Sequence, residues 1–273
     1  MDAVLPPGGL RKSAKFLVGR ASPFWRLVRS PGLRHRAFSD PEDTLLYALS
    51  LDRPEARFVC LGANEVGPGD PLGLYLHSGW EGLLVEPVPY IFRRLQQRCK
   101  ANPRLSLENA VVGPATGLAR FHYVEESPDL PRGYDHLGSL SGELLRSHTE
   151  VVPELLGRLT CADLPAFTLP DLLAKHRFGR FDLLVMDLEG FDLGALRQAD
   201  LARHEPLLIL YEHAFLGAAD ASAAEALLRA AGYEVLAMEQ DTAAVHAGAG
   251  GKLRAAWRVL RRAAEAGSLE VFP

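Results

Sequence analysis

Short, nearly continuous apolar runs recur along the chain from residue 57 onward. Examples are RFVCLG, GLLVEP and FDLLVMDLEG, and each ends in Gly, Pro or an acidic residue. Runs of this kind, without polar alternation, are typical of strands buried on both faces of a sheet. We therefore expect strands over residues 57–62, 82–87, 105–113, 181–190, 206–213, 234–238 and 242–247.

Helical spacing of apolar residues fills most of the intervals between these runs. In residues 90–101, for example, Ile91, Phe92, Leu95 and Cys99 fall on one face. Further helices are expected over residues 70–79, 169–176, 220–233 and 253–267. Alternating strands and helices predict an α/β fold with a mainly parallel sheet covered on both faces.

The chain of 273 residues is 48% hydrophobic and 23% charged, which suits one large globular domain with extensions. We expect a basic, partly helical N-terminal extension over residues 1–50, a main domain over 51–248 and an amphipathic C-terminal helix over 249–273. Within the main domain, residues 114–167 contain many Pro and Gly residues and are expected to form hairpin and loop. A docked C-terminal helix is favoured over one that contacts a membrane.

Several function classes find no support in the sequence. No apolar run is long enough to span a membrane, and no signal peptide is recognisable. The three cysteines lie far apart, so reduced thiols in a cytoplasmic protein are the simplest interpretation. We do not expect nucleic acid as a partner, because no nucleic-acid motif accompanies the basic residues.

Charge is distributed unevenly along the chain. Residues 1–36 carry eight Lys or Arg and one acid, whereas the whole chain has a net charge of −4. Three roles stay open for this basic arm: folding back on the acidic body, contacting an anionic membrane surface or a phosphate-bearing substrate, and binding a protein partner. A homodimer is also left open.

Two sites at strand ends suggest a nucleoside-type ligand. VCLGANEVGPGDP, residues 59–71, breaks an apolar run at Gly62, and glycine there allows a ligand to approach the backbone. Glu86 ends the next run, 24 residues later, where a nucleoside-binding fold places a carboxylate for ribose hydroxyls. Because GANEVGPG lacks a compact pyrophosphate turn, an adenosine-type ligand fits better than a dinucleotide.

Six ordered blocks of the chain resemble those of FkbM-type S-adenosylmethionine-dependent methyltransferases. The blocks are GANEVGPGDP, GWEGLLVEPVP, LENAVV, FTLPDLL, FDLLVMDLEGFD and LLILYEH. The resemblance implies a Rossmann-like class I methyltransferase fold, a seven-stranded mainly parallel sheet with the last strand antiparallel. It also implies S-adenosylmethionine as cofactor and O-methylation of a natural product or glycan intermediate. One departure is Glu65, because the family usually has Asp after GAN.

Cofactor-binding residues follow from the resemblance. Gly62, Ala63 and Asn64 would lie near the methionine part of S-adenosylmethionine, and Glu86 would hold the ribose. Asn109 and Ala110 would flank the adenine. Pro87 is expected to shape the loop more than to touch the ligand.

MDLEG and LYEH supply the candidate catalytic residues. Asp187 and Glu189 follow the fourth strand, where they would hold the cofactor, the substrate or a metal, unless they only cap the next helix. Glu212 and His213 end the fifth strand, and His213 is the expected general base. Asp187, Glu189, Glu212 and His213 also offer ligands for Mg²⁺ or Mn²⁺, a metal-assisted alternative.

Residues 114–167 are expected to contact the methyl acceptor, a small molecule or a glycan, because long irregular segments often set specificity. His136, Ser139, Ser141 and His148 are the candidates there. N-methylation, carboxyl methylation and a non-catalytic cofactor-binding or docking module remain alternatives to O-methylation.

Overall fold

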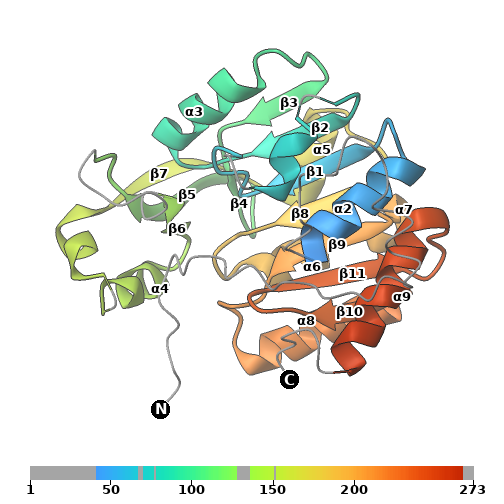
Figure 1. The fold of residues 1–273 in the computed structure, drawn as a ribbon. Helices are drawn as coiled ribbons and strands as arrows, with labels where there is room; N and C mark the ends of the chain where they lie inside the picture. The colour runs from blue at the N-terminus through green and yellow to red at the C-terminus, as the bar shows by residue number, and fades with distance from the viewer. Residues whose placement is uncertain (1–40, 67–69, 77, 128–135, 151, 267–273) are drawn as a thin grey trace.

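A seven-stranded sheet forms the centre of the computed structural model, which describes residues 41–66, 70–76, 78–127, 136–150 and 152–266 (Figure 1). Its strands are β1 (Arg57–Leu61), β2 (Glu81–Val85), β3 (Leu105–Glu108), β8 (Leu183–Met186), β9 (Leu208–Glu212), β10 (Tyr233–Ala237) and β11 (Asp241–His246). The order is β10-β11-β9-β8-β1-β2-β3. β11 pairs antiparallel with both neighbours, and the other pairs are parallel. The predicted seven-stranded fold is confirmed.

Helices cover both faces of this sheet, as the alternating pattern predicted. They are α2 (Pro41–Asp52), α3 (Pro89–Cys99), α5 (Leu169–Lys175), α6 (Asp192–Gln198), α7 (Leu201–His204), α8 (Ala218–Ala230) and α9 (Gly251–Glu265). Alternate residues of a strand point to opposite faces. In β1, Phe58 and Cys60 join the core under α2, α3 and α9, whereas Val59 and Leu61 join the core under α5, α6 and α8.

The C-terminal helix α9 is docked on the body, which confirms the favoured interpretation. Its buried residues are Leu253, Ala256, Trp257 and Leu260, and they belong to the core that also contains α2. The Trp257 indole nitrogen donates a hydrogen bond to Glu234 of β10 at 2.8 Å. Among the helices that the structure describes, none is long and apolar enough to cross a membrane.

Helix α2 lies in the segment expected to be an extension. Residues 41–50 form most of it, and Leu45, Leu46 and Leu49 are fully buried in the main core. The sequence therefore placed the start of the packed body later than the structure does. The basic arm of residues 1–36 lies outside the described residues, so its proposed roles stay predictions.

A second sheet stands beside the main one, at the left of Figure 1. It consists of β4 (Val111–Val112), β7 (Leu159–Phe167), β5 (Gly117–Val124) and β6 (Gly138–Ser139), in the order β4-β7-β5-β6. The connection from β6 to β7 contains α4 (Gly142–Ser147), η4 (His148–Glu150) and η5 (Pro153–Arg158). The hairpin and loop expected over 114–167 thus contain antiparallel pairing of β5 with β6 and β7, and short helices occupy part of the connection between β6 and β7.

The strand expected over 105–113 is really two strands in different sheets. β3 pairs with β2, whereas β4 pairs with β7. Between them, the Asn109 side-chain amide donates hydrogen bonds to the carbonyls of Glu86 and Pro87 at 2.8 and 3.0 Å. These bonds hold the chain where it leaves one sheet for the other.

The short helix expected over 70–79 is shorter in the described residues, where it is a 3₁₀ helix, η2 (Pro71–Leu74). The Asp70 carboxylate accepts a hydrogen bond from the Leu72 N–H at 2.8 Å and caps this turn. Gly73 lowers the helical propensity of the segment. The chain leaves the turn at Tyr75, whose ring stacks on Trp80 at 4.4 Å.

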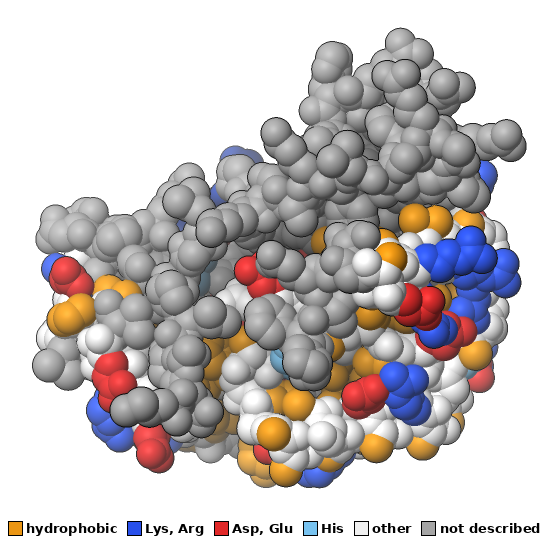
Figure 2. Space-filling view, turned by 60° about the horizontal axis from the view of Figure 1, so that its bottom comes forward, with side chains coloured by type: hydrophobic (Ala, Val, Ile, Leu, Met, Phe, Trp, Pro, Cys, Tyr) orange, Lys and Arg blue, Asp and Glu red, His pale blue; other side chains and the backbone are white. Residues whose placement is uncertain are grey.

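Several basic side chains lie along α9. Figure 2 shows Lys and Arg side chains gathered at its right-hand edge, the side on which α9 lies in Figure 1. Two of the α9 arginines, Arg254 and Arg261, donate hydrogen bonds to Glu234 at 2.6 and 2.9 Å. Together with Trp257 they hold the pKa of Glu234 down at about 2.

Candidate active site

A cavity of about 380 Å³ opens at the carboxyl ends of β1, β2 and β8. Volumes of this order suit a small-molecule ligand. Its lining residues come from both sheets: Gly62, Asn64, Glu86, Pro87, Val88, Ala110, Val111, Val112, Phe121, His136, Leu137, Gly138, Leu140, Asp187, Leu188 and Glu189. The structure therefore brings most of the predicted cofactor-binding residues together in one cavity.

Gly62 is required where β1 and β8 end side by side. Its φ is +74°, and a Cβ added there would lie 1.8 Å from the carbonyl oxygen of Asp187. The Asp187 N–H donates to the Leu61 carbonyl at 3.0 Å, which holds the two strand ends in this contact. The absence of a side chain at Gly62 thus allows two backbones to approach each other closely, and it also leaves room for a ligand.

Glu86 joins the first loop to the end of β2. One carboxylate oxygen accepts a hydrogen bond from the Asn64 N–H at 2.9 Å, and the other accepts from the Val88 N–H at 2.7 Å. Each oxygen keeps a second lone pair, so the carboxylate can still accept two hydroxyl hydrogen bonds. Glu86 is only 5% exposed. Burial raises its pKa to about 7, against the lowering effect of the two backbone N–H groups.

Other predicted cofactor residues occupy different positions around the cavity. Pro87 and Ala110 line it directly. Ala63 is buried, and its N–H donates to the Val85 carbonyl at 2.9 Å. The Asn109 amide is committed to the backbone of residues 86 and 87, and Asn109 is not among the lining residues. The adenine roles of Asn109 and Ala110 stay predictions.

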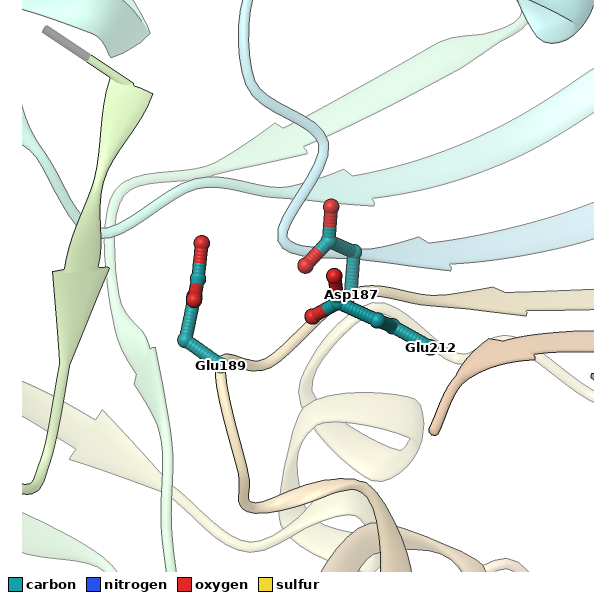
Figure 3. Close-up of side chains that lie close together, drawn as sticks. All are labelled: Asp187, Glu189 and Glu212. Carbon is teal, nitrogen blue, oxygen red and sulfur yellow. The ribbon is translucent and has the colours of Figure 1, made fainter. Parts of the chain in front are cut away.

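Three carboxyl groups meet beside the cavity. Asp187 and Glu189 follow β8, Glu212 ends β9, and one oxygen of each lies within 4.8 Å of the others. Figure 3 shows these side chains gathered at the ends of the two strands. Since β8 and β9 are adjacent and parallel, as expected, the pairing itself brings Glu212 to Asp187.

Electrostatic repulsion and burial shift the pKa values of this acidic cluster upward. The Asp187 side chain faces the cavity, where solvent can reach it, but it lies deep among protein atoms. This partial removal from water, together with the Asp241 charge, raises the pKa of Asp187 to about 6. Burial and the Asp187 charge raise the pKa of Glu212 to about 12 and that of Glu189 well above its usual range. The cluster therefore holds its protons more tightly than three separate carboxyl groups in water would.

Neither Asp187 nor Glu189 occupies the N-cap position of the following helix. The N-cap position of α6 is Phe191, which makes no side-chain capping bond. It is Asp192 that accepts a hydrogen bond from the Leu188 N–H, at 3.3 Å. Phe191 thus occupies the capping position instead of Asp187 or Glu189, and the alternative in which these acids only favour the start of the helix stays a prediction.

His213 lies next to Glu212 in sequence but is not one of the cavity-lining residues. The Nδ1 atom of its ring is 3.0 Å from the Thr242 hydroxyl, and its backbone N–H donates to the Gln240 carbonyl at 2.9 Å. Burial lowers the pKa of His213. The structure thus orients its ring toward β11, and its role as general base stays a prediction.

The acceptor-side candidates divide into one cavity residue and three others. His136 lines the cavity. Ser139 is buried against the turn at Glu189, and the Ser141 side chain caps α4 by accepting from the Leu144 N–H at 3.2 Å. His148 is buried beside Phe215, with ring centroids 5.1 Å apart.

Glu65, the departure from the family pattern, is not one of the cavity-lining residues. Its carboxylate oxygens lie 3.8 Å from the Arg98 guanidinium and 4.0 Å from His136 Nε2. The longer side chain therefore spans from the first loop to α3 and to the segment before β6. No sequence signal indicated these contacts.

The apolar wall of the cavity was missed by sequence reasoning. Val111, Phe121, Leu137 and Leu140 come from the second sheet or the residues next to it. Phe121, Leu137 and Leu140 lie in the segment expected to be hairpin and loop, and Val111 lies at the end of the strand expected over 105–113, which gave no sign of a second sheet. The FHY stretch around Phe121 is the one signal that could have located this wall, since a large buried aromatic beside a predicted cavity favours contact with an aromatic ligand.

Comparison with known proteins assigns this arrangement to a family. The model for the methyltransferase FkbM domain matches residues 62–235, well over half of the chain. The chain belongs to the FkbM methyltransferase family. No curated protein matches it.

Solved structures that are similar to this FkbM family member match it with low identities and low TM-scores. A fibrillarin pre-rRNA processing protein of Methanococcus jannaschii is 10% identical, with a TM-score of 0.40 and 77% of each chain covered. A SAM-dependent methyltransferase of Thiobacillus denitrificans, in complex with S-adenosyl-L-homocysteine, is 12% identical, with a TM-score of 0.36, covering 90% of this chain and 83% of that one. Similarities this low add nothing to the family match.

Proposed function

We propose that this FkbM family member is an S-adenosylmethionine-dependent O-methyltransferase that acts on a hydroxyl of a natural product or glycan intermediate. The observation that carries the proposal is the position of Glu86. Its buried carboxylate lines a cavity at the carboxyl ends of three parallel strands and keeps two acceptor positions for ribose hydroxyls.

The cavity fits the other parts of this cofactor. Val88, Val111 and Val112 offer an apolar surface for the adenine, close to Ala110. Asp187 follows β8, on the other side of β1 from β2, and offers a negative charge that would stabilise a nearby sulfonium. S-adenosylmethionine supplies an activated methyl group, so the protein has mainly to align the reactants.

Asp187 is the proposed acceptor of the proton. In O-methylation the acceptor oxygen bonds to the methyl carbon while the carbon–sulfur bond breaks, and the hydroxyl loses its proton. A carboxylate that lines the cavity and has a pKa of about 6 suits this task, because it is ionised at neutral pH but close to the operating range. Glu189 is proposed to orient the acceptor beside it.

Calorimetry with S-adenosylhomocysteine tests the proposal. The wild-type protein should bind it, and Glu86→Ala should weaken binding by about 1–3 kcal/mol because charge-assisted hydrogen bonds are lost. Glu55→Ala, which removes an exposed acid, serves as the matched control and should change nothing. An absence of binding heat in the wild type, or an unchanged affinity in Glu86→Ala, contradicts the proposal.

A divalent metal is a second candidate, favoured by the proximity of Asp187, Glu189 and Glu212. Hard oxygen ligands of this kind suit Mg²⁺ or Mn²⁺, which would lower the pKa of a bound hydroxyl. His213 does not belong to this group. Heat on titration of Mn²⁺ into wild type, lost in Glu212→Gln, would support the metal; methyl transfer that persists after chelation would remove it.

The acidic cluster also bears on the other acceptor classes. A carboxylate acceptor would be repelled by Asp187, which makes carboxyl methylation the weaker alternative, whereas an amine would not be repelled. Transfer of labelled methyl groups to a pathway extract, followed by mass spectrometry, identifies the modified atom. Cofactor binding without transfer to any acceptor would favour a docking module.

A further inference from the structure

A serine of the second sheet holds the turn that carries Glu189. Ser139 is 2% exposed. Its hydroxyl donates to the Glu189 carbonyl at 2.9 Å and accepts from the Ser141 N–H at 3.0 Å. The single hydroxyl proton of Ser139 is therefore committed to Glu189, even though the two residues are 50 positions apart in the chain.

The turn itself adopts a conformation that needs external support. Glu189 has a φ of +48°, and Gly190 follows with +96°. A non-glycine residue in the left-handed region costs about 1–2 kcal/mol. Neighbouring residues pack closely against the turn, since a Cβ added at Gly190 would lie 3.3 Å from the Leu144 side chain of α4 and 3.6 Å from the Phe215 carbonyl.

We propose that Ser139 is a positioning residue that holds Glu189 in this conformation and so keeps its carboxyl group beside Asp187 in the cavity. Without the hydrogen bond, the Glu189 backbone can relax toward an ordinary right-handed conformation. The carboxyl group would then leave the cluster shown in Figure 3. The inference rests on the proposed function, because it requires the cavity to hold S-adenosylmethionine.

The charge of the cofactor gives a readout that needs no acceptor. S-adenosylmethionine carries a positive sulfonium, whereas S-adenosylhomocysteine has a neutral thioether in the same place. A nearby positive charge favours the ionised form of a carboxyl group, so a correctly placed Glu189 favours the first over the second. Ser139→Ala should lower this preference, measured as the ratio of the two dissociation constants, by about fivefold.

Glu189→Gln and the double variant show whether Ser139 acts through Glu189. Glu189→Gln should lower the preference at least as much, and adding Ser139→Ala should then have no further effect, because coupled residues are not additive. Ser141→Ala is the matched control: it removes the α4 cap but not the bond to Glu189, and should leave the preference unchanged. Thermal unfolding checks that each variant is folded.

The two failures are distinguishable. An unchanged preference in folded Ser139→Ala, or effects of Ser139→Ala and Glu189→Gln that add in the double variant, would overturn the positioning role while both ligands still bind. If neither ligand binds the wild-type protein, the proposed function fails instead.

Discussion

Glu86 links the two loops that leave β1 and β2. The backbone N–H groups of Asn64 and Val88 both end on its carboxylate, and its pKa of about 7 lies within the physiological range. The sequence could indicate this residue, because a carboxylate directly after a continuously apolar strand is costly to bury unless polar groups bind it. It could not indicate the partners of Ser139 and Glu65, since these depend on how the second sheet meets the first.

Cofactor affinity should depend on pH through Glu86. Ribose hydroxyls donate to the ionised carboxylate, so binding is favoured once Glu86 loses its proton. Affinity for S-adenosylhomocysteine should therefore rise as the pH rises toward about 7 and level off above it. Calorimetry across this range measures the effect, and Glu86→Gln should flatten it. A pH dependence that persists in Glu86→Gln would assign the titration to another group.

His213 can be tested independently of Glu86. If His213 is the base, His213→Ala should retain cofactor affinity and lower turnover by about 10²–10⁴-fold. Asp187→Asn should produce the loss instead if Asp187 accepts the proton. Methyl transfer measured with both variants decides between the two residues, and loss of cofactor binding in His213→Ala would contradict the role of His213 as base.

Secondary-structure elements differ in how well their sequences reveal them. The central strands β1, β2, β8 and β9 were predictable because they are buried on both faces, which makes their sequences continuously apolar. The short strands β4 and β6, with two residues each, carry no periodicity at all. The crossing between the sheets at Asn109 was likewise invisible, because it depends on hydrogen bonds to the backbone of residues 86 and 87.

Helix α9 should contribute to stability without affecting the cavity. Trp257→Phe keeps an aromatic ring in the core but removes the hydrogen bond to Glu234, which should cost about 1.5–3 kcal/mol. Denaturant unfolding measures the loss, and Arg258→Ala on the exposed side of the same helix is the control. S-adenosylhomocysteine affinity should be unchanged, so a drop would show that α9 and the cavity are coupled.

The molecule as a whole concentrates acids at one end of its sheet. Besides Asp187, Glu189 and Glu212, the fully buried Asp192 has its pKa raised to about 8 by burial and by the Asp187 charge. Each of these groups binds a proton more tightly when folded than when unfolded. The free energy of unfolding therefore falls as the pH rises above the ordinary pKa of a carboxyl group. The same acids give the cavity the negative charge that suits a cationic ligand.

Stability without ligand should therefore fall as the pH rises from about 4, where the carboxyl groups of the unfolded chain ionise, to about 8, where Asp192 ionises in the folded protein. About 2 kcal/mol of this fall should lie between pH 6.5 and 8, and below about pH 4 both states are protonated and the loss is absent. Asp192→Asn should be more stable at the upper pH and show a weaker dependence, whereas Asp200→Asn, at an exposed site, should behave like wild type. Denaturant unfolding at several pH values measures this, and rising stability would contradict it.

The separation of the two sheets divides the cavity between two parts of the chain. One wall belongs to the strands that hold Gly62, Glu86 and Asp187, and the other belongs to β4, β5 and the residues around β6. Because the chain passes from one to the other at Asn109 and returns after β7, residues 111–167 form a continuous cassette. Exchange of its part from β5 to β7, residues 117–167, between relatives would alter which acceptors are recognised, while β4 and the proposed adenine surface would stay in place.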